Sequence, residues 1–160
     1  MPVQALFGIS VLLSFVAFGT VAKSYIWPRV RGLRGPAALA PLVVPHAFRF
    51  VGLSFLVPGV VSPALSPAFA VPAAYGDLAA AILALVSIWA LATRASWAIP
   101  MVWVFNVWGT ADLLNAIYEG LIGVGIDPAT LGAAFFLPTL IVPALLILHG
   151  MIFRLLLRRK

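Results

Sequence analysis

Five apolar runs, each close to twenty residues long, alternate with short segments rich in proline, glycine or charged residues. A helix of about 20 residues, rising 1.5 Å per residue, crosses the ~30 Å apolar core of a bilayer. The runs lack the two-residue alternation of membrane β-strands. The sequence therefore predicts an all-α, single-domain bundle of five transmembrane helices, over residues 3–22, 39–60, 75–93, 97–117 and 131–153.

Positive charges are distributed unevenly over the segments that join these runs. Nine of the ten Lys and Arg residues lie in the first connection, in the third connection or after the last run. They are Lys23, Arg29, Arg31, Arg34, Arg94, Arg154, Arg158, Arg159 and Lys160. With five spans all these segments share one side, and cytoplasmic segments are enriched in Lys and Arg. We therefore expect an integral protein of a bacterial cytoplasmic membrane, with its N-terminus outside and its C-terminus in the cytoplasm.

The composition restricts the classes of function. Only 9% of the residues are charged and the mean hydropathy is +1.15, whereas a water-soluble domain carries about 25% charged residues. The absence of cysteine excludes disulfides, iron–sulfur clusters and thiolate metal sites. The net charge of +6 follows from the cytoplasmic cations, so we expect no nucleic-acid partner. The sequence contains no phosphate-binding loop, HExxH or GxSxG motif, which favours a non-enzymatic protein.

Prolines and glycines indicate where the helices stop or bend. The connection over residues 61–72 is predicted to be stiff and non-helical because it contains Pro63, Pro67 and Pro72. The connection over 119–130 contains glycines and an Asp-Pro turn signal, and Thr130 is expected to cap the last helix. Three other prolines lie inside predicted helices, where they should kink or loosen the backbone: Pro45, Pro138 and Pro143.

An arginine lies near the middle of the second predicted helix. Arg49 is twelve residues from Ala37 and eleven from Val60, so it falls near the centre of the bilayer. A guanidinium at that depth requires a counter-ion or water, and Asp112 is the carboxylate well inside another predicted helix. We therefore predict an Arg49–Asp112 ion pair, which serves either a binding site or helix packing alone. His46, three residues before Arg49, faces the same side.

One face of the fourth predicted helix combines aromatic and polar side chains. Phe105, Trp108, Asp112 and Asn115 share this face by their spacing of three or four residues. The face is suited to a planar or cationic ligand, and equally to interhelical packing.

Three further polar residues are assigned to other places. Asn106 and Thr110 fall on a separate face of the same helix. Asp77 lies near the outer start of the third predicted helix, where we interpret it as an N-cap and helix-dipole partner. A gate or entry site for cations is the alternative for this aspartate.

The two histidines, His46 and His149, are predicted at similar depths of facing helices. Two such imidazoles are the minimal ligand set for a haem iron. His149 lies near the cytoplasmic end of its helix, where it is also suited to extend toward the interface. Both imidazoles can exchange protons near neutral pH.

These features favour a membrane protein that binds or translocates a small ligand or ion in a polar pocket between the second, fourth and fifth predicted helices. Two alternatives are a haem-binding redox protein and an accessory subunit of a membrane complex. A homo-oligomer or a larger complex is expected because a small bundle encloses little volume. The predicted ligand-binding residues are His46, Arg49, Trp108, Asp112, Asn115 and His149.

Overall fold

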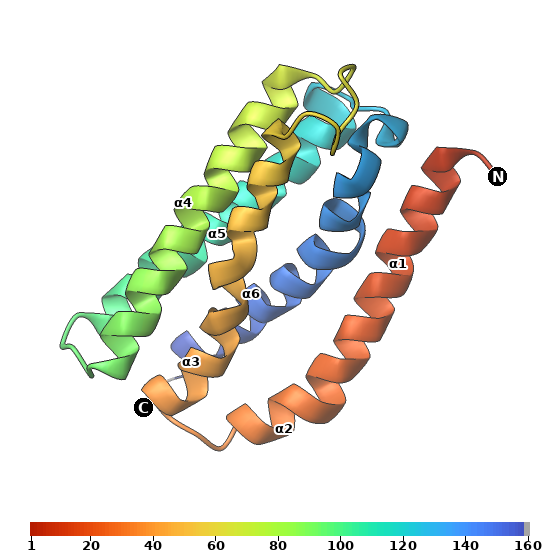
Figure 1. The fold of residues 1–160 in the computed structure, drawn as a ribbon. Helices are drawn as coiled ribbons and strands as arrows, with labels where there is room; N and C mark the ends of the chain where they lie inside the picture. Colours follow the sequence, from red (N-terminus) through yellow and green to blue (C-terminus); the bar gives the residue numbers. More distant parts are fainter. Residues whose placement is uncertain (159–160) are drawn as a thin grey trace.

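Long helices run between the two ends of the protein and occupy all the apolar runs of the sequence (Figure 1). This computed structural model describes residues 1–158, and within that range the chain forms helices and no named strand. The α-helices are α1 (Val3–Val21), α2 (Trp27–Val30), α3 (Pro36–Val43), α4 (Pro67–Ala92), α5 (Ala98–Tyr118) and α6 (Val142–Leu156). The π-helices are η1 (Ala22–Ile26), η3 (Glu119–Gly123) and η5 (Leu137–Ile141), and the 3-10 helices are η2 (Val44–Leu56) and η4 (Pro128–Phe135).

Four helical segments of the described chain are long and apolar enough to cross a membrane. They are Val3–Val30, Pro36–Leu56, Pro67–Ala92 and Leu137–Leu156. The predicted all-α class is therefore confirmed, together with helices that are compatible with membrane insertion. The fourth predicted run forms α5, which has 21 residues but is not one of these four. This helix carries the polar residues Asn106, Thr110, Asp112 and Asn115.

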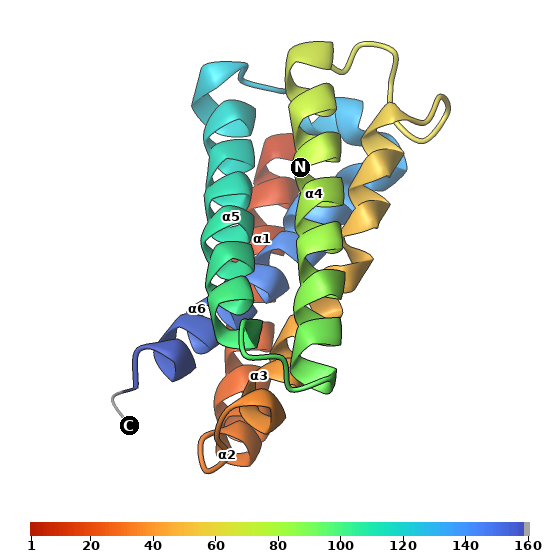
Figure 2. The same ribbon diagram turned by 90° about the vertical axis from the view of Figure 1, so that its left-hand side faces the viewer.

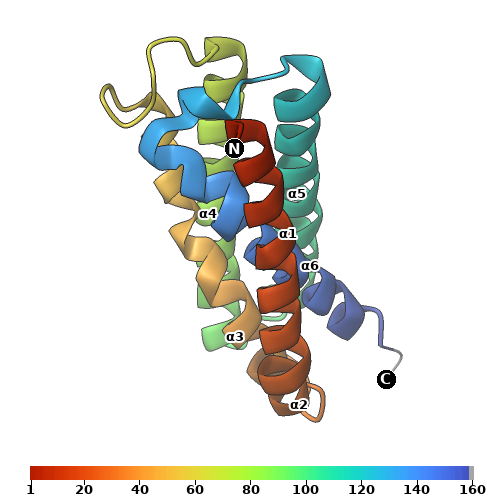
Figure 3. The ribbon, with the colours of Figure 1, turned by 90° about the vertical axis from the view of Figure 1, so that its right-hand side faces the viewer.

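The helices pack as a bundle in which α4 and α1 lie on different sides. α4 contacts η2 and α5, and Figure 2 shows α4 and α5 side by side. α6 contacts α1, α3 and α5, whereas α1 lies at the edge of the bundle, against α6, η4 and η5 (Figure 3). The buried apolar side chains form two clusters, one around Leu42, Phe105 and Ile152 and another around Phe55 and Leu131. Along η2 and α4, a layer of polar residues lies between these clusters.

The segments that carry the positive charges meet at one end of the bundle. α2, the connection between α4 and α5 and the end of α6 lie at this end, opposite the N-terminus (Figure 1). Arg154 and Arg158 place their guanidinium groups 4.3 and 4.7 Å from the centre of the Trp27 ring. Arg158 Nη1 also donates to the carbonyl oxygen of Arg31 at 2.6 Å, which ties α6 to α2. Arg159 and Lys160 lie outside the described residues.

The 3-10 conformation of η2 determines which of its side chains face the core. Its buried residues are spaced by three: His46, Arg49, Gly52 and Phe55. A 3-10 helix has three residues per turn, so these positions align on one face, whereas in an α-helix they would drift to the opposite side. Pro45 lies at the start of this segment and Pro138 lies in the π-helix η5, which confirms that these prolines loosen their helices.

The connection before α4 is shorter than predicted. α4 begins at Pro67, because proline at the first helical position has its backbone angle already set for a helix. The prediction of a non-helical segment through residue 72 was therefore wrong from Pro67 onward. Asp77 consequently lies in the third turn of α4 rather than at its start, and its interpretation as an N-cap was wrong.

The segment before α6 is capped by a different residue than expected. The Asp127 side chain accepts a hydrogen bond from the Ala129 N–H at 3.0 Å and caps η4, whereas the Thr130 hydroxyl donates to the Asp127 carbonyl. The prediction that Thr130 caps the last helix was wrong. η4 contains a kink at Gly132, whose φ is 53° and whose missing Cβ leaves room for the carbonyl of Val60.

Candidate functional site

A buried arginine with two carboxylate partners lies in the polar layer of the bundle. Arg49 Nη2 lies 2.5 Å from Asp112 Oδ2, which confirms the predicted ion pair. Arg49 Nε donates to Asp77 Oδ1 at 2.8 Å, and Nη1 donates to the Gly109 carbonyl at 3.0 Å. Arg49 is only 2% exposed, whereas the carboxylate side chains keep 17% (Asp77) and 14% (Asp112) of their surface. The guanidinium is therefore enclosed, and the carboxylates form its outer edge.

The charge of this group is unbalanced. With both carboxylates ionised, Arg49, Asp77 and Asp112 together carry one surplus negative charge. Each guanidinium nitrogen donates to an oxygen, and two of these oxygens belong to carboxylates, so the charge of Arg49 is already more than neutralised. Arg49 uses one oxygen of each carboxylate, and within residues 1–158 the other oxygen accepts no hydrogen bond. A positive charge is therefore the natural complement of this cluster.

Three glycines allow the helices to approach one another around these charges. A Cβ added at Gly52 would overlap the carboxylate of Asp77, and one at Gly76 would overlap that of Asp112. A Cβ at Gly109 would lie 2.7 Å from His149 Cε1 and 2.9 Å from Arg49 Nη1. The ion cluster is thus accommodated by the absence of side chains on three different helices.

We expect Gly109→Ala to destabilise the protein by about 1–3 kcal/mol, because the added methyl group must displace a buried imidazole and guanidinium. Gly150→Ala is the matched control on α6, since a Cβ there meets nothing within 4 Å. The control should stabilise its helix slightly, by up to ~1 kcal/mol. Thermal unfolding of both variants in the same detergent measures the difference. Equal effects of the two substitutions would contradict the close approach at Gly109.

The two histidines lie together in the core, beside the ion cluster formed by Arg49, Asp77 and Asp112. His46 and His149 are 0% and 1% exposed, and their ring centres are 4.1 Å apart. His149 Nδ1 lies 2.7 Å from Asn106 Oδ1, and Asn106 Nδ2 donates to the His149 carbonyl at 3.3 Å. The interpretation that His149 extends toward the interface was therefore wrong. Asn106, which the sequence placed on a separate face, is a buried partner of this histidine.

The histidine pair does not fit the axial positions of a haem. Bis-imidazole ligation requires an iron and a flat macrocycle between the two rings. His46 and His149 instead contact each other at an interplanar angle of 48°, and Phe105 lies within 5.1 and 5.4 Å of the two ring centres. The core around the rings is filled by side chains.

A cavity of about 220 Å³ lies on the outer side of the carboxylates. It is lined by residues of α1, η2, α4, α5, η3, η4, η5 and α6, and its walls are mainly apolar and aromatic. The rings in its lining are Phe7, Phe15, Phe55 and Phe69, and its ionisable residues are Asp77 and Asp112. An apolar cavity of about 150 Å³ accommodates benzene, so this cavity has room for an aromatic ring with a small head group.

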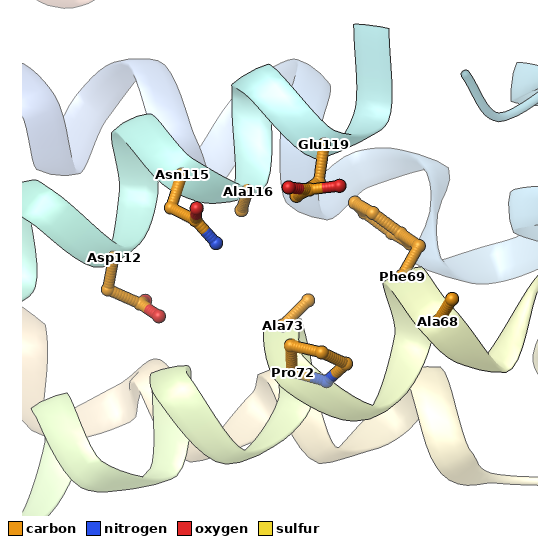
Figure 4. Close-up of a pocket in the computed structure, with 8 residues that line it drawn as sticks. All are labelled: Ala68, Phe69, Pro72, Ala73, Asp112, Asn115, Ala116 and Glu119. Carbon is orange, nitrogen blue, oxygen red and sulfur yellow. The ribbon is translucent and has the colours of Figure 1, made fainter. Parts of the chain in front are cut away.

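A smaller pocket lies between α4 and α5, next to the cavity, and Asp112 lines both. Figure 4 shows Asp112 and Asn115 of α5 and Glu119 at the start of η3, opposite Pro72 and Ala73 of α4. Its volume is about 10 Å³, which is enough for about one water molecule. Pro72 has no N–H to donate to the carbonyl of Ala68, another residue of the lining. The pocket is a narrow space beside the larger apolar cavity, and its polar side chains are Asp112, Asn115 and Glu119.

The predicted ligand-binding residues separate into three groups. Asp112 lines the cavity, and Asn115 lines the smaller pocket. Arg49, His46 and His149 lie together in the core behind the carboxylates and do not line either space. Trp108 is 50% exposed and lines neither space, so the aromatic wall expected there is absent. The helix of Arg49 contributes Phe55 to the cavity, and α1, which the predicted pocket did not include, contributes Phe7, Val11 and Phe15.

Comparison with known proteins identifies one protein family. A family defined by a domain of unknown function (DUF8737) matches residues 6–157. No curated protein and no solved structure matches the chain. The family match includes Arg49, Asp77, Asp112 and both histidines, so the whole candidate site lies in the matched region.

Proposed function

The chain belongs to the DUF8737 family, and we propose that it is a five-span integral membrane protein that binds a small monocation with an apolar body. α5 is the fifth span in this proposal. Its 21 residues extend for about 30 Å, and it packs against α4 and α6. Two of its polar residues, Asn106 and Asp112, form hydrogen bonds to other helices.

The orientation follows from the charged end of the bundle. The segments that carry Lys and Arg face the cytoplasm, so the N-terminus and the cavity face the outside. The binding site is then reached from the outer half of the membrane. Below it, the apolar cluster around Leu42, Phe105 and Ile152 closes the bundle toward the cytoplasm. This arrangement supports binding more directly than passage through the protein.

The chemistry of the ligand follows from one observation: the ionisable groups in the lining of an otherwise apolar cavity are two carboxylates that share one guanidinium. The surplus negative charge favours a cation, and the apolar lining favours a hydrocarbon body. Phenylalanine rings in the lining add cation–π attraction where the charge lies over a ring face. A protonated amine or quaternary ammonium with one aromatic ring has this chemistry.

The proposal is tested by calorimetric titration of the full chain in phosphatidylcholine nanodiscs. Benzyltrimethylammonium is a suitable probe because it is a permanent monocation with one ring. Neopentylbenzene, its neutral isostere, is the matched control. We expect the cation to bind at least about tenfold more tightly, which corresponds to ~1.4 kcal/mol. Equal affinity for the two compounds, or no binding of the cation, would contradict the proposal.

A further inference from the structure

Two arginines lie against one tryptophan at the end of the bundle opposite the N-terminus (Figure 1). The guanidinium carbons of Arg154 and Arg158 are 4.3 and 4.7 Å from the centre of the Trp27 ring. Trp27 is half-buried and packs against the apolar core, so its ring is a fixed platform for both charges. We call these three side chains the basic cluster, and nothing in the cation site described above uses them.

The positive charge of the basic cluster is not balanced by an acidic side chain. Arg154 and Arg158 are four residues apart, a spacing at which like charges repel each other on a helix. The chain has four acidic side chains. Two of them pair with Arg49, and the other two lie in η3 and at the start of η4, at the end of the bundle that carries the N-terminus. The counter-charge of the basic cluster therefore has to come from another molecule.

The two guanidinium groups keep hydrogen-bond donors for such a counter-charge. Arg158 Nη1 donates to the Arg31 carbonyl at 2.6 Å, which fixes the position of this side chain. Within residues 1–158, the other nitrogens of Arg158 and all those of Arg154 donate to no protein atom, and both side chains are exposed. Guanidinium groups match the oxygens of a phosphate, to which they often donate two parallel hydrogen bonds. The donors of the basic cluster therefore favour an oxyanion such as a phosphate group.

The position of the basic cluster along the bundle matches the depth of lipid head groups. The apolar segment Val3–Val30 has 28 residues and is therefore about 40 Å long, whereas the apolar core of a bilayer is ~30 Å thick. Trp27 lies near the end of this segment, beyond the length that the apolar core can cover. Tryptophan is enriched at this level of membranes, and arginine side chains extend toward it. The phosphate groups of phospholipids lie at the same level.

We propose that the basic cluster binds the phosphate group of an anionic phospholipid. Arg154 and Arg158 donate to the phosphate oxygens, and the Trp27 ring holds both guanidinium groups in position. The lipid supplies the negative charge that the side chains of this end lack. The site rests on the membrane insertion proposed above, and the proposed orientation places it in the cytoplasmic leaflet. It does not depend on the cation cavity, which lies toward the other end of the bundle.

Native mass spectrometry of the full chain in detergent tests the site, because it resolves each bound lipid. The probe is palmitoyl-oleoyl phosphatidylglycerol, and the control is the phosphatidylcholine with the same acyl chains, whose net charge is zero. We expect phosphatidylglycerol to bind at least about tenfold more tightly. Equal binding of the two lipids would overturn the proposal.

A soluble phosphate separates a lipid from a free anion as the ligand. The compound sn-glycerol 3-phosphate carries the phosphate group without acyl chains, and we expect it to bind at least about tenfold more weakly than phosphatidylglycerol. Equal affinities would assign the basic cluster to a soluble phosphate and overturn the lipid site. No organic cation is added in these measurements, so a failure of the lipid site leaves the proposed cation site standing.

Charge variants test whether the basic cluster is the site. Arg154→Gln with Arg158→Gln removes two exposed charges, and we expect it to weaken phosphatidylglycerol binding by at least about tenfold. Arg29→Gln with Arg34→Gln is the matched control, because it removes two exposed charges that do not lie over the Trp27 ring. These charges attract the lipid only from a distance, so the control should lose at most about threefold. Equal losses in the two variants would overturn the basic cluster as a specific site.

Discussion

Arg49→Met is expected to lower the free energy of unfolding by about 3–5 kcal/mol. The substitution retains a long, unbranched side chain but replaces the charged guanidinium by an apolar end. Two buried carboxylates therefore lose their counter-ion. Asp77 and Asp112 then repel each other across a layer that holds no other cation in contact with them. Arg34→Met is the matched control, because Arg34 is exposed and forms no ion pair within the described chain. Its effect should stay within about 0.5 kcal/mol.

A rescue variant separates charge from packing. Adding Asp77→Asn and Asp112→Asn to Arg49→Met removes all three charges while it retains the shape of the layer. We expect this triple variant to recover most of the lost stability, since the replacement of a whole buried charge group is often close to neutral. Chemical unfolding in one detergent compares the variants. A loss below about 1 kcal/mol for Arg49→Met, or no recovery in the triple variant, would show that the ion cluster does not hold the bundle together.

Asp112→Asn and Asp77→Asn are each expected to weaken binding of benzyltrimethylammonium by at least about tenfold, or ~1.4 kcal/mol. Either amide can still accept a hydrogen bond from Arg49, so the local structure is retained. The surplus negative charge is lost, and with it the attraction for a cation. Calorimetric titration in phosphatidylcholine nanodiscs measures the change.

Glu119→Gln is the matched control for the loss of an acid. Glu119 directly follows α5, at the start of η3, and lines the smaller pocket together with Asp112 but not the cavity. Its substitution should change affinity by less than about twofold if the two aspartates are the recognition groups. An effect of Glu119→Gln as large as that of Asp112→Asn would indicate that negative charge in general, and not the cavity, attracts the cation.

The helical class and the ion pair could be predicted from the sequence because both follow from the cost of leaving groups unsatisfied in lipid. A run of about 20 apolar residues has few alternatives to a helix there. Arg49, near the middle of such a run, requires a carboxylate, and Asp112 was the one placed well inside a helix. The pairing at 2.5 Å follows from this requirement and not from any sequence motif.

The second carboxylate was missed because the start of its helix was misplaced. Pro67 and Pro72 were interpreted as breaking the helix, whereas Pro67 begins α4 and Pro72 is tolerated inside it. The predicted helix began at residue 75, eight residues after the true start of α4. Asp77 was therefore placed close to its first turn and assigned a capping role. One signal was present: Gly76 precedes Asp77, and glycine in an apolar helix indicates a close approach.

The cavity could not be derived from periodicity, whereas the two histidines, predicted at similar depths of facing helices, do lie together. The inward stripe of η2 depends on a 3-10 repeat, and an α-helical reading puts Phe55 on the side opposite to His46. The predicted face of α5 is also divided: Phe105 is buried together with Asn106, which was placed on a separate face, whereas Trp108 is exposed. Which side chains of a helix face the core depends on how the helices cross. The spacing of residues within one helix does not specify that crossing.

The position of a bound cation tests the central claim most directly. We would crystallise the full chain in lipid with 4-bromobenzyltrimethylammonium and locate the bromine by anomalous diffraction. We expect the bromine among the phenylalanine rings of the cavity, with density for the ammonium group next to the carboxylates of Asp77 and Asp112. Anomalous signal found only outside the cavity, or an ammonium group directed away from both aspartates, would contradict recognition of the cation by the surplus charge around Arg49.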